Sequence, residues 1–195
     1  MRSFGGQLGA MIAGAMLAAL STLGAAPAYA DINLLAEENP LIVAIGNNSL
    51  TEAKQAFLRG ANANSRDVNN VPAILLAVSA GEVDIVELLL DRNAAVDVAD
   101  QYGDNSLITA AQRGDSDMVK VLLAHGANPN FANKSGETPL IKAARAGYAG
   151  VVSQLLHAGA KVNLTDYTGR SAFSYAQDNR RAQVIKVLSE AGAAR

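Results

Sequence analysis

Two histidines, His125 and His157, are the residues of this chain best suited to acid–base or metal chemistry, because imidazole titrates near neutral pH and binds metals. They are the only histidines, and they lie 32 residues apart. Neither has a carboxylate at the short spacing that zinc ligands use. We therefore expect no metal site, and we interpret both as exposed residues at helix ends that interact with terminal carbonyl groups.

Other catalytic elements are missing from the sequence. Cysteine is absent, which excludes disulfide bonds, a thiol nucleophile, thiolate zinc ligands and a lipid-modified cysteine. The chain contains no Gly-x-Ser-x-Gly turn, phosphate-binding loop or His-Glu-x-x-His helix. A hydrolase would need a polar cluster, and the nearest candidates for one are Asp104, Arg113 and Glu137. The sequence favours a protein that is not an enzyme and that uses no cofactor.

Composition and charge narrow the classes of function further. Hydrophobic residues make up 50% of the chain and charged residues 17%, a balance that predicts a folded protein. The 16 Lys and Arg against 18 Asp and Glu give a net charge of −2, so no excess of positive charge favours a nucleic-acid partner.

Residues 1–30 have the form of an export signal. Arg2 is the only charged residue before Asp31, and residues 8–23 are uncharged and largely apolar. Ala28 and Ala30 form the small-x-small pattern of a cleavage site, so we expect Sec-type export to the periplasm, cleavage after Ala30 and no membrane association afterwards. The alternative is that residues 8–26 remain as a membrane anchor, because a span needs about 20 apolar residues.

The remaining residues, 31–195, repeat with a period of 33. Two columns of the repeat hold alanine in every copy: Ala44, Ala77, Ala110, Ala143 and Ala176, and then Ala61, Ala94, Ala127, Ala160 and Ala193. Each copy predicts two short antiparallel helices. In the fourth copy Thr138 caps a helix over 139–146 that ends at Gly147, and a second helix covers 149–157. Since one helix pair buries little apolar surface, its stability must come from stacking on its neighbours.

The repeat resembles the ankyrin repeat, whose pattern includes T-P-L-H-x-A, then G, a V-V-x-x-L-L helix and G-A-D-x-N. The first half of that pattern is matched by Thr138, Pro139, Leu140, Ala143, Ala144 and Gly147, and the second half by residues 122–130, LLAHGANPN. The resemblance covers about residues 34–193. It implies an all-α solenoid of about five helix-turn-helix repeats with short hairpin-like connectors, at about 34–66, 67–99, 100–132, 133–165 and 166–195.

The chain departs from the ankyrin pattern at identifiable columns. The histidine of T-P-L-H is replaced in every copy, by Ile42, Leu75, Ile108, Ile141 and Ser174, so apolar packing is expected in its place. In the last copy Arg180 stands where most other copies have a helix-ending glycine, and Ser189 replaces a leucine. The first copy has Ala53 and Ala56 in place of larger residues, and Glu37 in place of a glycine. We interpret both terminal copies as caps.

The resemblance also implies a place for a partner. In the family, the connector tips and the exposed side of the first helices form a concave groove that holds another protein. Carried over column by column, the tips hold Gln101, Tyr102, Lys134, Ser135, Tyr167 and Thr168, with Asp104, Glu137 and Arg170 behind them, and the helices add Gln112, Arg113 and Arg145. Tyrosine and arginine often carry the binding energy of an interface. The alternative for Tyr102 and Tyr167 is packing against neighbouring turns.

These features favour a monomeric, periplasmic binding protein with one protein partner. Two roles suit an exported ankyrin protein: an accessory factor for a periplasmic enzyme, such as the catalases that some family members accompany, or an immunity protein that blocks a toxin. The sequence leaves both roles open.

Export can be tested directly. We predict a mature protein that begins at Asp31 and appears in the osmotic-shock fraction, because Ala28 and Ala30 form the cleavage pattern. Intact-mass measurement of the recovered protein checks this. Recovery of the full 195-residue chain from the membrane fraction would show that the segment is an anchor.

Overall fold

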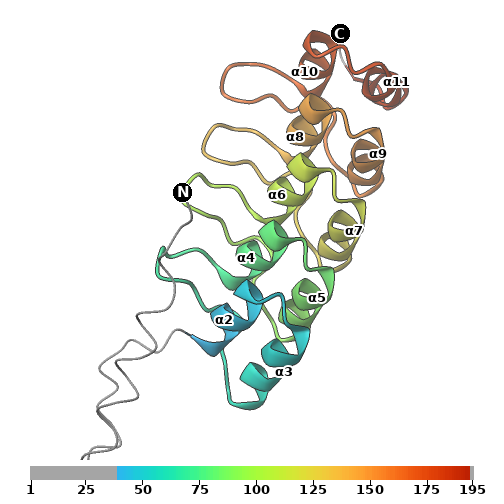
Figure 1. Ribbon diagram of the computed structural model, residues 1–195. Helices are drawn as coiled ribbons and strands as arrows, with labels where there is room; N and C mark the ends of the chain where they lie inside the picture. Colours follow the sequence, from blue (N-terminus) through green and yellow to red (C-terminus); the bar gives the residue numbers. More distant parts are fainter. Residues whose placement is uncertain (1–38, 194–195) are drawn as a thin grey trace, which may run out of the picture. The chain divides into compact units, whose positions relative to one another are not determined.

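The computed structural model describes residues 39–193, which belong to one compact unit. These residues form ten helices in five antiparallel pairs (Figure 1). The first helices of the pairs are α2 (Pro40–Gly46), α4 (Ala73–Ala80), α6 (Ser106–Arg113), α8 (Pro139–Ala146) and α10 (Ala172–Asp178). The second helices are α3 (Leu50–Leu58), α5 (Val83–Asp91), α7 (Ser116–Ala124), α9 (Ala149–His157) and α11 (Ala182–Glu190). The predicted all-α repeat solenoid is therefore confirmed, and both helices of the fourth copy have the predicted bounds.

The expected export signal, residues 1–30, lies outside the described residues. Across 39–193, no helix is both long enough and apolar enough to cross a membrane.

Each first helix begins and ends at a repeated column. Side chains of Asn39, Asn105, Thr138 and Ser171 accept a backbone N–H from the first turn of the helix that follows, as a helix cap does. The first helices end at a left-handed residue, a glycine in three of the copies. Arg180 takes this conformation as well, with φ of 53°, so the last repeat keeps the turn although an arginine there costs about 1 kcal/mol or more.

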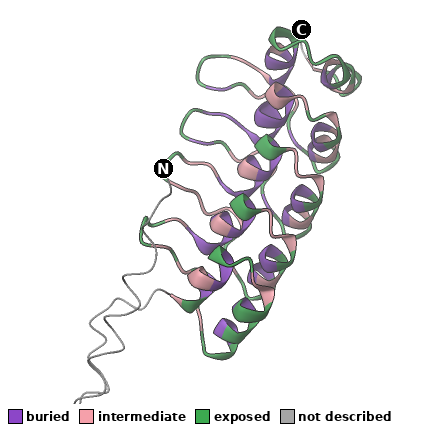
Figure 2. Ribbon diagram, viewed as in Figure 1, coloured by how far each residue is buried: buried purple, intermediate pink, exposed green. Residues whose placement is uncertain are grey.

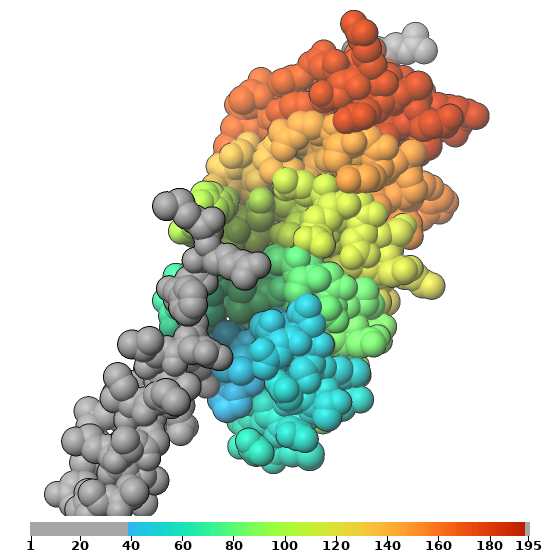
Figure 3. All heavy atoms as spheres, viewed as in Figure 1, coloured from blue at the N-terminus to red at the C-terminus, as the bar shows by residue number. Residues whose placement is uncertain are grey.

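The helices form two layers, because each first helix packs on the next first helix and each second helix on the next second helix. Figure 3 shows the repeats as successive bands along the stack. Buried residues lie mainly on the sides of the helices that face each other (Figure 2). The alanines of the first helices are fully buried in all five repeats, at Ala44, Ala77, Ala110, Ala143 and Ala176. A larger side chain in this column would force the helices apart, which costs stability in a close-packed interior.

Polar side chains also join consecutive repeats just after the second helices α3, α5 and α7. The backbone N–H of Ala95 donates to Asn64 Oδ1 at 2.8 Å, and that of Lys161 donates to Asn130 Oδ1 at 2.7 Å. Asp97 holds the equivalent place and accepts from the N–H of Asn128. These bonds pair backbone groups that would otherwise need water, so they fix the spacing of the repeats.

The connectors, at residues 66–72, 99–105, 132–138 and 165–171, are narrow hairpins. Isolated antiparallel bridges close three of them, at Arg66 and Pro72, Ala99 and Asn105, and Thr165 and Ser171. In the last three repeats they also stack on one another. The N–H of Lys134 donates to the carbonyl of Tyr102 at 3.3 Å, and that of Tyr167 to the carbonyl of Ser135 at 3.0 Å. A glycine lies at each contact, because a Cβ on Gly103 would come within 2.7 Å of the Lys134 nitrogen.

Because the stack has open ends, replacing equivalent leucines in different repeats should lower the free energy of unfolding by different amounts. Leu122 in α7 and Leu188 in α11 are both fully buried, but α7 has second helices on both sides, whereas α11 has α9 on one side only. We expect Leu122→Ala to lower the free energy of unfolding by about 2 to 5 kcal/mol and Leu188→Ala by less, since the open end can relax. Urea unfolding measures both changes. Equal losses would argue against the last repeat being a cap.

Candidate functional site

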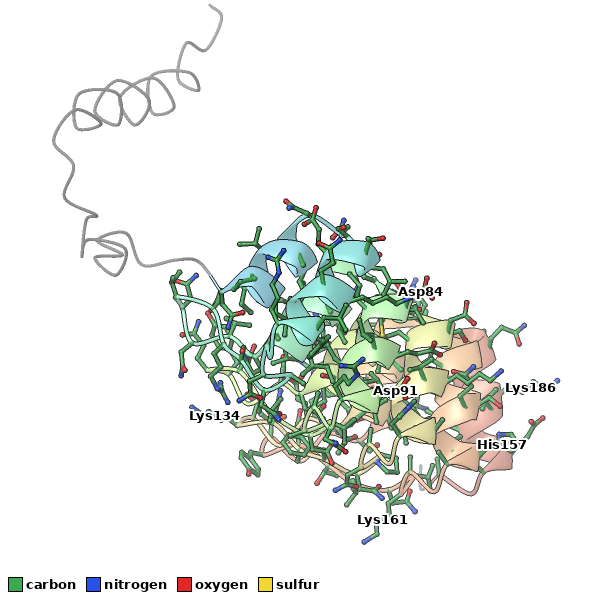
Figure 4. All side chains as sticks on the ribbon, turned by 90° about the horizontal axis from the view of Figure 1, so that it is seen from below. Asp84, Asp91, Lys134, His157, Lys161 and Lys186 are labelled. Atoms are coloured by element: carbon green, nitrogen blue, oxygen red, sulfur yellow. The ribbon has the colours of Figure 1, made fainter. Side chains whose placement is uncertain are left out.

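The connector tips carry side chains that are exposed although their backbones are fixed. Tyr102 is 67% exposed and Tyr167 is 80% exposed. Lys134 Nζ donates to the carbonyl of Gln101 at 2.9 Å, which links two successive tips. Figure 4 shows Lys134 at the connector edge of the stack, across from Lys186 and His157 on the second helices. The tips therefore present polar and aromatic groups on a stacked backbone.

Tyr167 also packs against its neighbouring turn. A Cβ on Gly136 would lie 2.7 Å from Cδ1 of the Tyr167 ring, so the ring lies directly over that glycine. The ring is nevertheless mostly open to solvent. Packing on the neighbouring turn thus orients Tyr167 and leaves it accessible to a partner.

Behind the tips, Glu137 is the centre of a buried polar cluster. Its carboxylate contacts Lys142 Nζ and Arg145 Nη1, each at 2.6 Å, and accepts a hydrogen bond from the Asn133 side-chain amide at 3.2 Å. The same amide group donates to Asp104 Oδ1 at 2.7 Å. Burial alone would raise the pKa of Glu137, but the hydrogen bonds from Lys142 and Asn133 and the two positive charges lower it below its usual value.

A second polar centre lies within the last repeat. Asp166 is buried and accepts hydrogen bonds from the side chains of Thr168 and Tyr175 and from the backbone of Thr168 and Arg170. Burial raises the pKa of Asp166, but these hydrogen bonds outweigh it and lower the pKa to about 2. The bond to Asp166 also raises the pKa of Tyr175.

The ring of Tyr175 links the two centres, because the guanidinium groups of Arg145 and Arg170 both lie against it, at 5.1 and 4.0 Å from its centroid. Arg170 also forms an ion pair with Asp178. Both arginines are therefore held by internal partners, and Glu137 is buried. The charges of these three predicted partner-binding residues are thus paired with charges of the chain itself.

Gln112 and Arg113 lie on the exposed end of α6, as the resemblance implied. Arg113 Nη1 donates to the carbonyl of Ser79 in the preceding repeat at 2.7 Å, and Nη2 would lie 3.6 Å from a Cβ on Gly81. Among residues 39–193, no carboxylate forms an ion pair with Arg113. Its charge is thus held in position and remains available to a partner.

Sequence reasoning missed four residues of this polar support: Asn133, Lys142, Asp166 and Tyr175. One signal could have found two of them. Lys142 and Tyr175 occupy the same column, which holds Val43 and Leu76 in the first two copies, so polar groups replace apolar ones only towards the end of the chain. A lysine in such a column needs a buried carboxylate, and Glu137 supplies it.

The two histidines lie at the ends of second helices, as interpreted from the sequence. His125 Nδ1 is 2.9 Å from the carbonyl of Val121, and His157 Nδ1 is 2.7 Å from that of Ser153. Within the described part of the chain, no three His, Asp or Glu side chains gather as a metal site would require.

The three candidates for a hydrolase cluster do not converge. Asp104 and Glu137 share the amide of Asn133, whereas Arg113 contacts Ser79 in another repeat.

Comparison with protein families gives one result. A model described as ankyrin repeats in three copies matches residues 41–133 and, in an overlapping second match, residues 107–194. The matches together cover all five helix pairs. Comparison with curated proteins gives no match.

The Asp166 centre predicts how stability depends on pH. The pKa of Asp166 is about 2 in the folded state against an ordinary value of 3.8, so the carboxylate contributes about 2 kcal/mol at neutral pH. Because the folded pKa is the lower one, this contribution is present above about pH 4 and is lost as the pH falls towards 2.

Tyr175→Phe should remove part of that contribution, because it deletes one hydrogen bond to Asp166 and keeps the ring under the two arginines. We expect a loss of about 1 to 2 kcal/mol at pH 7 and a smaller further loss between pH 4 and pH 2. Denaturant unfolding across this pH range measures both. Tyr148→Phe is the control, because it deletes the hydroxyl of a tyrosine that is 40% exposed. An acid transition of Tyr175→Phe identical to that of the parent would contradict the prediction.

Proposed function

Because the chain belongs to the ankyrin repeat family, whose repeats form protein–protein interaction modules, we propose that it holds one protein partner. In this proposal the partner binds in the groove formed by the connector tips and the exposed ends of the first helices. The protein needs no chemistry of its own for this role, since positioning a partner is a function in itself.

The main support for the proposal is the location of the large hydrophobic side chains that are exposed to solvent. Within residues 39–193 these are Leu58, Val68, Tyr102, Tyr148 and Tyr167. Three of the five, Val68, Tyr102 and Tyr167, lie on connector tips of three different repeats. Exposed tyrosines on a rigid backbone lose little conformational freedom on binding and bury large areas. Their spacing along the stack suits a partner that contacts several repeats at once.

Arg113 adds a positive charge to the proposed binding surface. It is the groove arginine that no carboxylate neutralises among the described residues, whereas Arg145 is paired with Glu137. A cation held by a backbone carbonyl favours a negative or carbonyl-rich group on the partner. We propose that the partner presents an acidic or carbonyl-rich segment at Arg113.

The proposed location is the periplasm of a Gram-negative bacterium, and its support is the form of residues 1–30. The proposed role is that of a monomeric accessory factor to a periplasmic enzyme, for which a catalase is one candidate. An immunity protein against a toxin would use the same groove, and the functions of neighbouring genes separate the two roles.

Affinity capture tests the proposal. The purified protein is immobilised, exposed to a periplasmic extract of its own source and washed, and the retained proteins are identified by mass spectrometry. We expect one protein retained at a fixed ratio. Retention of no protein above that on an immobilised unrelated domain would contradict the proposal.

The tyrosines predict a separation of binding from stability. In the double variant Tyr102→Ala, Tyr167→Ala the free energy of unfolding should stay within about 1 kcal/mol of the parent, because both side chains are exposed. Affinity for the captured partner should fall by about tenfold or more. Calorimetric titration and urea unfolding measure the two quantities.

Leu58→Ala is the matched control, since Leu58 is 83% exposed but lies on α3, away from the connectors. It should bind as the parent does. Arg113→Glu should slow association, and most strongly at low salt. If the double-tyrosine variant loses stability and binds the partner normally, the two tyrosines support folding and do not contribute to binding.

A further inference from the structure

The connectors of the second and third repeats, residues 66–72 and 99–105, lack the backbone hydrogen bond that links each pair of later connectors. By the pattern of Lys134 with Tyr102 and Tyr167 with Ser135, the backbone N–H of Gln101 should donate to the carbonyl of Asn69. In the described part of the chain neither of these two backbone groups has a backbone partner. The stack of connectors is therefore interrupted at one place.

Asn70 explains the interruption. It occupies the column of Gly103 and Gly136 and has the same left-handed backbone, with φ of 63°. At those glycines a Cβ would come within 2.7 Å of the Lys134 nitrogen and 2.9 Å of the Tyr167 nitrogen. Asparagine has that Cβ, so a connector carrying Asn70 cannot approach the next one equally closely.

A hollow of about 400 Å³ lies between the two connectors. It is lined by residues 69–71 of one connector, residues 99–101 of the other, and Arg66. This volume falls within the range of ligand pockets, about 300 to 1,000 Å³. Two complementary backbone groups, one donor and one acceptor, thus belong to connectors held apart by a space that a ligand could enter.

The charged side chains beside the hollow are already engaged. Asp67 Oδ1 accepts the N–H groups of Asn69 and Val71, and Asp100 Oδ1 accepts those of Tyr102 and Asp104. Arg66 Nη1 donates to the carbonyl of Asn70 at 2.8 Å. The Gln101 N–H and the Asn69 carbonyl remain as one main-chain donor and one main-chain acceptor, a pair that a ligand with main-chain groups of its own can complement. The side-chain amides of Asn70 and Gln101 add further polar groups to the lining.

We propose that this gap receives an extended main-chain segment of the protein partner, which lies between the two connectors as an added strand. A carbonyl of the segment accepts from the Gln101 N–H, and an N–H of the segment donates to the Asn69 carbonyl, as in peptide recognition by strand addition. Val68, 94% exposed, and Tyr102 are the chain neighbours of Asn69 and Gln101, which line the gap, and their exposed side chains supply apolar contact area. This inference rests on the proposed function and names the chemistry of its partner.

Two variants isolate the gap. Asn70→Gly removes the Cβ that separates the connectors, so the backbone N–H of Gln101 should donate to the backbone carbonyl of Asn69. The Gln101 backbone amide should then exchange with deuterium about tenfold more slowly. Asn93→Gly is the matched control, because Asn93 is also left-handed, with φ of 62°, but ends α5 away from the gap. It should leave the exchange of the Gln101 amide unchanged.

The binding probe is a phage-displayed library of random linear dodecapeptides, selected on the purified protein. We expect selected peptides to protect the Gln101 amide from exchange in the parent protein, and to bind Asn70→Gly about tenfold more weakly than the parent or Asn93→Gly. The proposal is overturned if selection yields no binding peptide, if bound peptides leave the Gln101 amide unprotected, or if Asn70→Gly binds them as the parent does.

The proposed function can fail separately. If Arg113→Glu abolishes binding of the captured partner and Asn70→Gly has no effect on it, the groove is used and the gap is not. If Asn70→Gly weakens that binding and the tyrosine and Arg113 variants do not, the gap is used without the rest of the groove.

Discussion

Contact between neighbouring repeats is the constraint on which the rest of this structure depends. A helix pair of this size buries too little apolar surface to be stable alone, so each pair is stabilised by the pairs on either side. The fully buried alanine of every first helix sets how closely the helices approach. Asn64, Asp97 and Asn130 set the same spacing at the ends of the second helices, where their side chains accept backbone N–H groups of the next repeat.

The same spacing determines the shape of the proposed binding surface. Where connectors approach within hydrogen-bonding distance, a glycine is required, as at Gly103 and Gly136, and the tips become a continuous stacked edge. Where the column holds Asn70, the edge is interrupted. The polar cluster around Glu137 and Asp166 supports this edge from behind in the last three repeats. A single column of the repeat thus changes a structural contact into an opening that a ligand could enter.

Much of the fold follows from the sequence, because the repeat averages the signal over five copies. The alanine columns, the cap at Thr138 and the end at Gly147 place both helices of the fourth copy correctly. The side-chain contacts of the proposed binding surface were less predictable. Column position indicates that Arg145 and Glu137 lie near the groove, but only the structure shows that they pair with each other and that Tyr175 lies against Arg145. Arg180 is a further example, since it takes a left-handed conformation that its residue type disfavours, in a turn where the Arg181 N–H donates to the carbonyl of Ala176 at 2.8 Å.

The central claim is that a protein partner binds at the connector edge, and hydrogen–deuterium exchange of the protein with and without its captured partner tests it most directly. The account predicts that the partner slows exchange in the connectors, at residues 66–72, 99–105, 132–138 and 165–171, and at the exposed end of α6. The second helices α5, α7 and α9 should exchange as they do in the free protein. Slower exchange confined to those second helices, with unchanged connectors, would contradict the account.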